Sequence, residues 1–295
     1  MGLTLFLQQL INGVSLGSLY ALVAIGYTMV YGILRLINFA HGDLLMVSAY
    51  AAIYGIILFS LPWYLSFPLA VFATGAMGIL LDRSAYKPLR EAPRISLLIS
   101  AIGASFLMEN IALVVIGGVP KPFPRPDFFG RVVEIWGLHI QVLTFYTPLI
   151  TVLLVLMLLY IVFKTKAGKA MRAASRDFEA TRLMGIDLDR IIALTFLLGS
   201  GLAAAGGIMW AMKYPQVNPF MGIIPGLKAF IAAVLGGIGN IMGAVIGGFL
   251  LGLGEILIVA LLPQIAQYRD AIAFMILILV LLFRPTGIMG ERESG

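Results

Sequence analysis

Long apolar runs constrain the fold of this sequence more than any other feature. The run at 142–163, VLTFYTPLITVLLVLMLLYIVF, contains no charged residue. A helix needs roughly 20 apolar residues to cross the hydrocarbon core of a bilayer. Hydrophobic residues make up 61% of the chain and charged residues 12%, whereas soluble domains carry about 25% charged residues. The sequence therefore predicts an all-α, polytopic integral membrane protein.

The apolar runs predict about eight or nine transmembrane helices, which form a single transmembrane domain over residues 1–295. No Lys or Arg precedes Arg35, and a cleaved signal peptide would begin with a basic segment. We therefore expect the first run to be retained as a helix. The predicted spans are 8–33, 43–60, 64–81, 95–116, 142–163, 190–212, 226–240, 241–262 and 270–284.

The loops between the runs differ in charge, and this difference predicts an orientation. Lys and Arg are concentrated at 81–94 and at 164–190, and basic loops normally lie in the cytoplasm. The Pro-rich segment 117–141 holds fewer basic residues and is predicted to be an external loop. With these assignments, the N-terminus lies outside and the C-terminus lies in the cytoplasm.

Two segments, at 34–43 and 236–243, interrupt the apolar pattern. The first, LRLINFAHGD, includes Asn38 and His41, and the second is rich in glycine around Asn240. Irregular backbone at membrane depth is tolerated only where protein or a water-filled cavity covers it. Paired interruptions in two halves of a chain are typical of transport pathways. We interpret both as interrupted helices with a hinge-like role, and an ordinary tight hairpin with packed glycines is the alternative for the second.

Polar residues inside the predicted spans are informative because burying them in lipid is costly. Glu109 and Asn110 lie well inside the span 95–116, and Glu255 lies inside 241–262. Such side chains either face a translocation pathway or are neutralised by neighbouring helices and serve packing. For Glu255 we favour packing.

We assign a translocation pathway to the polar residues of the interruptions and of one span. For the two residues of the first interruption, capping of backbone groups freed by the break is the favoured alternative. The pathway candidates are Asn38, His41, Glu109, Asn110 and Asn240.

The sequence lacks the patterns of common catalytic and cofactor sites. It has no Cys, and His41 and His139 lie far apart, so no metal-ligand cluster is predicted. No G-x-x-x-x-G-K-[ST] phosphate loop occurs. We therefore expect no catalytic residues, bound metal or cofactor on this chain.

The basic loop at 164–190 has a helical, amphipathic pattern from Gly168 to Met184. Gly185 is predicted to end this helix. Because the charged face carries both signs, we favour docking to a partner protein over binding to anionic lipid. The apolar stripe consists of Met171, Ala174, Phe178 and Thr181, and the charged stripe of Lys169, Arg172, Arg176 and Glu179.

Three segments of the sequence resemble the LivH-type permeases of branched-chain amino-acid ABC importers. The segment INGVSLGSLYALVAIGYTMVYGILRLINFAHGDLLMVSAY at 11–50 is similar to the N-terminal signature of these permeases. The segment GLKAFIAAVLGGIGNIMGAVIGGFLLGLGE at 226–255 is similar to their C-terminal signature. The segment GKAMRAASRDFEATRLMGID at 168–187 resembles their cytoplasmic coupling loop.

The resemblance implies an assembly and a role for the coupling loop. A LivH-type subunit pairs with a related LivM-type permease, docks two ATP-binding subunits that hold ATP and Mg²⁺, and receives substrate from a periplasmic binding protein. The docking pattern E-A-A-x-x-x-G is matched with Thr181 in place of the second Ala. The residues assigned to ATPase coupling are Arg172, Asp177, Phe178, Glu179, Ala180 and Gly185.

The resemblance implies ATP-driven import of leucine, isoleucine and valine across the bacterial inner membrane by alternating access. Permeases for urea or short-chain amides and broader amino-acid permeases carry similar signatures and are alternatives. An ion-coupled secondary transporter, with Glu109 and Glu255 carrying protons or sodium ions, is a rival from another class. A structural or signalling membrane protein is a further rival. The coupling motif favours the ATP-driven importer.

Overall fold

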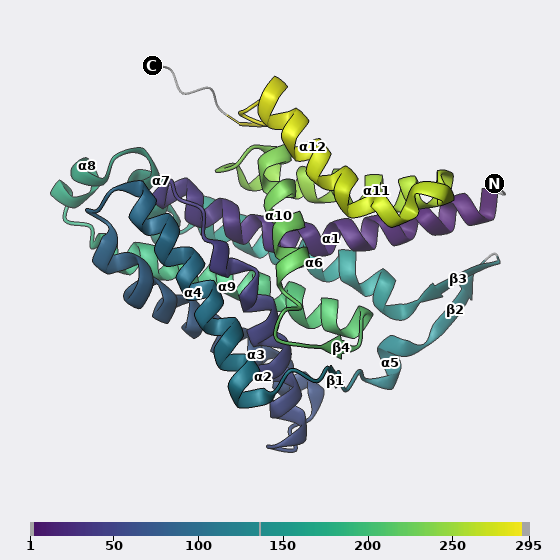
Figure 1. Cartoon of the computed structure of the whole chain (residues 1–295). Helices are drawn as coiled ribbons and strands as arrows, with labels where there is room; N and C mark the ends of the chain where they lie inside the picture. The colour runs from purple at the N-terminus through teal and green to yellow at the C-terminus, as the bar shows by residue number, and fades with distance from the viewer. Residues whose placement is uncertain (1–2, 136, 291–295) are drawn as a thin grey trace.

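A computed structural model describes residues 3–135 and 137–290 as a bundle of helices with two small β-sheets (Figure 1). The helices are α1 (Leu3–Leu34), α2 (Asp43–Ile57), α3 (Trp63–Leu81), α4 (Arg94–Ile116), α5 (Asp127–Gly130), α6 (Val142–Lys164), α7 (Lys166–Arg176), α8 (Phe178–Leu183), α9 (Leu188–Lys213), α10 (Ile223–Gly236), α11 (Ile241–Leu261) and α12 (Arg269–Phe283). Short helical turns are η1 (Phe39–His41), η2 (Asp82–Tyr86), η3 (Lys87–Leu89) and η4 (Pro263–Tyr268). The strands β1 (Lys121–Pro122) and β4 (Gln216–Val217) pair antiparallel, as do β2 (Val132–Ile135) and β3 (Leu138–Gln141).

Within the described residues, eight helical segments are long and apolar enough to cross a membrane. This confirms the prediction of an all-α, polytopic membrane protein. The span predicted at 226–240 corresponds to α10, which has 14 residues. At about 1.5 Å of rise per residue, a helix of this length is too short to cross a full hydrocarbon core. It packs instead as one arm of a hairpin with α11.

The first helix, α1, lies at the centre of the bundle, and 94% of its most apolar window is buried. It packs against α6, α9, α10 and α11. Its contact with α11 is close because glycines face each other. A Cβ added at Gly252 would lie 2.2 Å from the Gly17 backbone nitrogen, and one added at Gly17 would lie 2.8 Å from the Phe249 Cα. Small residues at these positions let the two helices approach as far as their backbones allow.

Three long helices lie on the outside of the bundle. Only 22% of the most apolar window of α4, 28% of that of α6 and 6% of that of the α12 segment is buried within the chain. Their outward side chains are large and apolar, as Phe106, Leu153 and Leu282 illustrate. Exposed apolar surfaces of this kind are suited to lipid or to another membrane subunit.

The predicted interruption at 34–43 is confirmed. Helix α1 ends at Leu34, Arg35 adopts a φ of 54°, and a single turn, η1, precedes α2. The break packs tightly against the start of α10, because a Cβ added at Gly42 would lie 2.8 Å from the Gly222 carbonyl oxygen. The irregular backbone is therefore covered by protein, as membrane depth requires.

The predicted interruption near 236–243 is present, but it takes the form of the alternative given above, a tight hairpin with packed glycines between α10 and α11. Gly237 and Gly239 adopt φ values of 110° and 97°, which residues with a side chain rarely adopt. The Asn240 Oδ1 atom accepts a hydrogen bond from the Gly243 backbone N–H at 3.0 Å and so caps α11.

The segment after α12 folds back over this hairpin. The Ile288 N–H donates to the Leu235 carbonyl at 3.0 Å, and the Met289 N–H donates to the Gly236 carbonyl at 2.9 Å. The last carbonyl groups of a helix have no partner within the helix, so this segment completes the end of α10.

The two ends of the bundle carry different structures (Figure 1). Helices α7 and α8 lie at one end, and the hairpin of β2 and β3 lies at the other. The predicted loop at 117–141 contains β1, α5, β2 and β3. Phe123 and Phe129 from this segment are buried, and Phe129 packs edge-on against Trp63 with ring centroids 5.6 Å apart. The segment is therefore folded onto the bundle.

The substitution Gly252→Ala is expected to destabilise the bundle, because the added methyl group would overlap the Gly17 backbone. Overpacking of this kind costs about 1–3 kcal/mol. The midpoint of thermal unfolding in detergent should fall by several degrees. Gly254→Ala is the matched control: it lies in the same helix with nothing within 4 Å of the added carbon, and its midpoint should not fall. Equal midpoints for the two variants would contradict the packing of α1 against α11.

Candidate functional site

The break between α1 and α2 holds two of the predicted pathway residues in the interior of the chain. Asn38 and His41 are each 1% exposed. Asn38 Oδ1 accepts a hydrogen bond from the Tyr86 hydroxyl at 2.6 Å. The His41 ring packs edge-on against Tyr27, with centroids 4.6 Å apart. The capping interpretation is wrong for Asn38, because its side chain makes no capping hydrogen bond to η1.

A pair of carboxyl groups lies next to this break. Asp43, the first residue of α2, accepts a hydrogen bond from Ser105 Oγ in α4 at 2.5 Å. Glu109, one turn further along α4, interacts with the same carboxyl group. Both acidic residues are buried. A carboxylate on its own only accepts hydrogen bonds, so one shared proton would satisfy the pair. Sequence reasoning identified Glu109 as a pathway candidate but did not include Asp43.

Asn110 and Asn240 do not join this buried group. The Asn110 side chain is exposed on the outer surface of α4, where its Nδ2 donates to the Phe106 carbonyl at 2.7 Å. Asn240 caps α11 and donates through Nδ2 to the Met289 carbonyl at 3.0 Å. The five pathway candidates therefore separate into one cluster, of Asn38, His41 and Glu109, and two isolated side chains.

A second buried polar cluster joins α1, α10, α11 and α12. The Lys228 Nζ atom lies 2.7 Å from Glu255 Oε1 and 2.6 Å from Asp270 Oδ1. The second oxygen of Glu255 accepts a hydrogen bond from the Tyr20 hydroxyl at 2.9 Å. Lys228 and Glu255 are 2% and 6% exposed. The charges neutralise each other inside the bundle, which supports the packing interpretation of Glu255.

Sequence reasoning missed the role of Lys228. It is a lone basic residue in the apolar stretch GLKAFIAAVL, and opposite charges in neighbouring spans usually pair. The pairing could not be assigned because the hairpin of α10 and α11 had not been placed against α12.

The loop predicted as one coupling helix forms two helices. Asp177 has extended backbone angles, φ −154° and ψ 115°, and its Oδ1 accepts a hydrogen bond from the Ala180 N–H at 3.0 Å. It therefore ends α7 and caps α8. The prediction of a continuous helix from Gly168 to Met184 is wrong, because the amphipathic pattern does not reveal the competing cap. Gly185, with a φ of 78°, ends α8 as predicted.

We use the name coupling segment for residues 165–187, which include α7 and α8. Side chains near its end point away from the bundle: Phe178 is 38%, Leu183 88% and Met184 81% exposed. Glu179, Ala180 and Gly185 are also exposed. Met171, Ala174 and Thr181 are buried. The apolar stripe predicted from the sequence is thus largely used to attach the segment to the bundle.

Arg172 belongs to this attachment. Its guanidinium donates to the Val162 carbonyl at the end of α6 and lies over the Phe163 ring, 5.2 Å from the centroid. Among the residues assigned to coupling, Arg172 therefore fixes the segment, whereas Phe178, Glu179, Ala180 and Gly185 present its outer surface.

Comparisons with known proteins cover nearly the whole chain. The sequence profile of a family described as "Branched-chain amino acid transport system / permease component" matches residues 9–281. The permease protein BraD of the high-affinity branched-chain amino acid transport system of Pseudomonas aeruginosa is 42% identical, over 98% of this chain and 97% of the relative. The corresponding LivH protein of Escherichia coli strain K12 is also 42% identical, over 98% of this chain and 96% of the relative.

Among solved structures, the chain is similar in fold to one titled "PsaBC from Streptococcus pneumoniae in complex with Fab". The TM-score is 0.50 at 13% sequence identity, and the match covers 96% of this chain and 92% of that one. At this identity the likeness concerns the arrangement of helices alone.

The substitution Lys228→Met is expected to destabilise the protein, because it removes the nearest cation from buried Glu255 and leaves only Arg269, whose Nε atom lies 3.6 Å from Glu255 Oε1. Removing one partner of a buried ion pair costs about 3–5 kcal/mol. The double variant Lys228→Met/Glu255→Gln should recover much of the lost stability, as a double-mutant cycle of thermal unfolding in detergent would measure. Lys166→Met, at an exposed position in α7, is the control. If the stability losses of the two single variants simply add up in the double variant, Lys228 and Glu255 do not stabilise each other.

Proposed function

Because the chain belongs to the family of branched-chain amino acid transport system permease components, we propose that it translocates leucine, isoleucine and valine as the membrane-spanning subunit of an ATP-driven importer. The family relationship extends over 98% of the chain, and this observation carries the proposal. The bundle of eight membrane-crossing segments within the described residues is a suitable scaffold for such a subunit. We place it in the bacterial inner membrane, with the N-terminus outside and the C-terminus in the cytoplasm.

The coupling segment is our proposed docking site for two ATP-binding subunits, which would hold ATP and Mg²⁺. The exposed Phe178, Leu183 and Met184 side chains support this proposal, since clustered apolar side chains on a surface mark sites of protein contact. Glu179 and Arg182 surround them with both signs of charge. At α8 the acidic Asp177 and Glu179 outnumber the basic Arg182, whereas an anionic lipid surface would attract an excess of basic side chains.

We propose that a LivM-type permease packs against the apolar outer helices and that a periplasmic binding protein docks at the opposite end. The side surfaces of α4, α6 and α12 are available for a membrane partner. The end that carries the hairpin of β2 and β3 faces away from the coupling segment (Figure 1). A binding protein that delivers substrate there would be separated from the ATP-binding subunits by the full length of the bundle.

The buried cluster around the first break is our candidate for part of the translocation pathway. Asn38, His41 and Glu109, together with Asp43, supply polar groups there, and buried apolar side chains such as Leu44 lie beside them. A branched-chain amino acid combines a zwitterionic backbone with an apolar side chain, and such a setting suits both parts. Asn110 faces outward from α4, so it would meet substrate only at a boundary between this chain and a second permease. Alternating access would then open this region to each side in turn.

Uptake by reconstituted vesicles tests the proposed function. The chain, a second permease, the ATP-binding subunits and the binding protein are placed in vesicles, and uptake of labelled leucine, isoleucine, valine and urea is measured. We expect uptake of the three amino acids that needs ATP and the binding protein. Preferred uptake of urea or short amides would show that these compounds, and not branched-chain amino acids, are the substrates. Uptake by this chain alone, driven by an ion gradient, would overturn the ATP-driven mechanism.

The substitution Glu179→Arg is expected to weaken association with the ATP-binding subunits, because it reverses a charge on the exposed face of α8. Co-purification of those subunits should fall by about tenfold, the change given by 1.4 kcal/mol, while membrane insertion stays normal. Glu134→Arg is the matched control: Glu134 is 66% exposed in β2, at the opposite end of the bundle. Normal co-purification with Glu179→Arg would contradict the docking site.

A further inference from the structure

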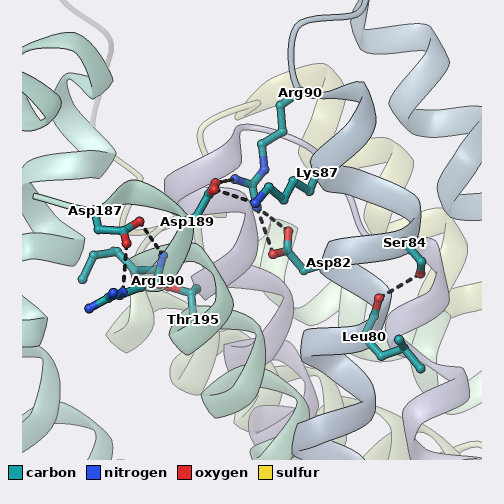
Figure 2. A network of polar contacts seen from close by, with 10 residues as sticks. Leu80, Asp82, Ser84, Lys87, Arg90, Asp187, Asp189, Arg190 and Thr195 are labelled. Carbon is teal, nitrogen blue, oxygen red and sulfur yellow. Dashed lines mark hydrogen bonds and ion pairs between the residues drawn. The ribbon is translucent and has the colours of Figure 1, made fainter.

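An arginine between α3 and α4 joins two acidic residues from distant parts of the chain (Figure 2). The Arg90 NH2 group donates to both oxygens of Asp82, at 2.6 and 2.9 Å, and its NH1 group donates to Asp189 Oδ1 at 2.6 Å. Lys87 Nζ lies 2.6 Å from the other Asp189 oxygen. The planar guanidinium can hold both carboxylates at once, which the single ammonium group of a lysine cannot do with the same geometry.

One side of this bridge leads directly to the coupling segment. Asp189 lies in the first turn of α9, two residues after Asp187, which caps that helix by accepting the Arg190 N–H at 3.2 Å. The Ile186 N–H in turn donates to the Thr181 carbonyl of α8 at 3.4 Å. The connection from α8 to Asp189 is therefore short and hydrogen-bonded, so a shift of α8 would also move Asp189.

The other side leads to the break at 34–43. Asp82 begins η2, a π-helical turn that ends at Tyr86. Tyr86 is fully buried, packs against Phe196 of α9 with centroids 5.4 Å apart, and donates its hydroxyl hydrogen bond to Asn38. Asn38 lies in the break between α1 and α2 and belongs to the candidate pathway cluster.

Residues 82–89, which lie between the Arg90 contacts and the Tyr86 contact with Asn38, have an unusual backbone. The π-helical turn η2 is followed at once by the 3-10 turn η3. Such turns depart from the α-helical hydrogen-bond pattern and often occur at functional hinges. A change between such local patterns is a discrete alternative of the kind needed to carry a signal between distant sites.

We propose that Arg90 and Tyr86 are positioning residues that transmit movement of the coupling segment to the break at 34–43. The proposal rests on the proposed function, since it concerns how the state of the ATP-binding subunits reaches the transport pathway. Arg90 holds the near end of the link at Asp189, and Tyr86 holds the far end at Asn38. Neither side chain needs to contact substrate.

The link predicts that substitutions at either end separate ATP hydrolysis from transport. We expect the variants Arg90→Lys and Tyr86→Phe to assemble into the complete reconstituted complex and to hydrolyse ATP. The amount of amino acid taken up per ATP hydrolysed should fall by about fivefold or more, because a typical coupling free energy is lost. Arg90→Lys keeps the charge beside Asp82, and Tyr86→Phe keeps the packed ring. Both variants are therefore expected to fold, which thermal unfolding would check.

Two matched substitutions serve as controls for this measurement. Arg190→Lys changes an arginine that is 87% exposed and is paired, within the described residues, with Asp187 of its own helix end. Tyr64→Phe changes a tyrosine that is 59% exposed at the start of α3. Neither control should alter uptake per ATP. A parallel fall of uptake and hydrolysis in Arg90→Lys, or no change in their ratio, would overturn the link.

A second readout does not depend on the substrate. The chain has no Cys, so Leu36→Cys introduces a single thiol on it, in the break. We expect ATP to change the rate at which a thiol reagent labels this position in the otherwise unchanged chain and in Arg190→Lys, but not in Arg90→Lys. A response that persists in Arg90→Lys, or that is missing from the unchanged chain, would overturn the link. The complex could fail to take up amino acids while ATP still changes the labelling rate in the unchanged chain but not in Arg90→Lys. This result would overturn the proposed substrate and support the link from Arg90 to the break.

Discussion

Lipid tails are as apolar as leucine, so helices in a bilayer gain little by hiding apolar surface from their surroundings. What holds α1 in the centre of this bundle is instead direct backbone contact, above all between Gly17 and Gly252. Helices α6, α9 and α10 also pack against α1. Helix α11 carries Glu255 to Lys228, and α1 ends at the break that Tyr86 reaches. The α1–α11 contact also brings Glu255 of α11 to the Tyr20 hydroxyl of α1.

The two buried polar clusters differ in how completely they are satisfied. Lys228, Glu255 and Asp270 form close ion pairs, and such an arrangement favours one fixed structure. At the break, by contrast, Asn38 has its oxygen bonded to Tyr86 and its Nδ2 without a protein partner among the described residues. Incompletely satisfied groups lower the cost of rearrangement, which suits the change of shape that we propose for this region.

Hydropathy alone identified the eight long apolar segments of the described residues, because lipid imposes length and polarity on each helix separately. It did not show that α10 is too short to be a full span. Both interruptions were also visible, since glycine and polar residues break an apolar pattern locally. The cap at Asp177 was missed because a helical stripe does not distinguish a continuous helix from two short ones. The contacts of Lys228 with Glu255 and of Tyr86 with Asn38 depend on helices that are distant in sequence. No local pattern encodes these contacts, and they supply most of the detail in the candidate site.

The segment that closes over α10 has a consequence for the order in which the protein is made. The backbone groups that satisfy Leu235 and Gly236 come from Ile288 and Met289, and Asn240 is bonded to a carbonyl 49 residues further along the chain. Synthesis proceeds from the N-terminus, so α10 and α11 leave the ribosome before the partners of their turn exist. Their hairpin thus first enters the membrane in an incomplete form, and the final segment of the chain completes it after α12 has been inserted.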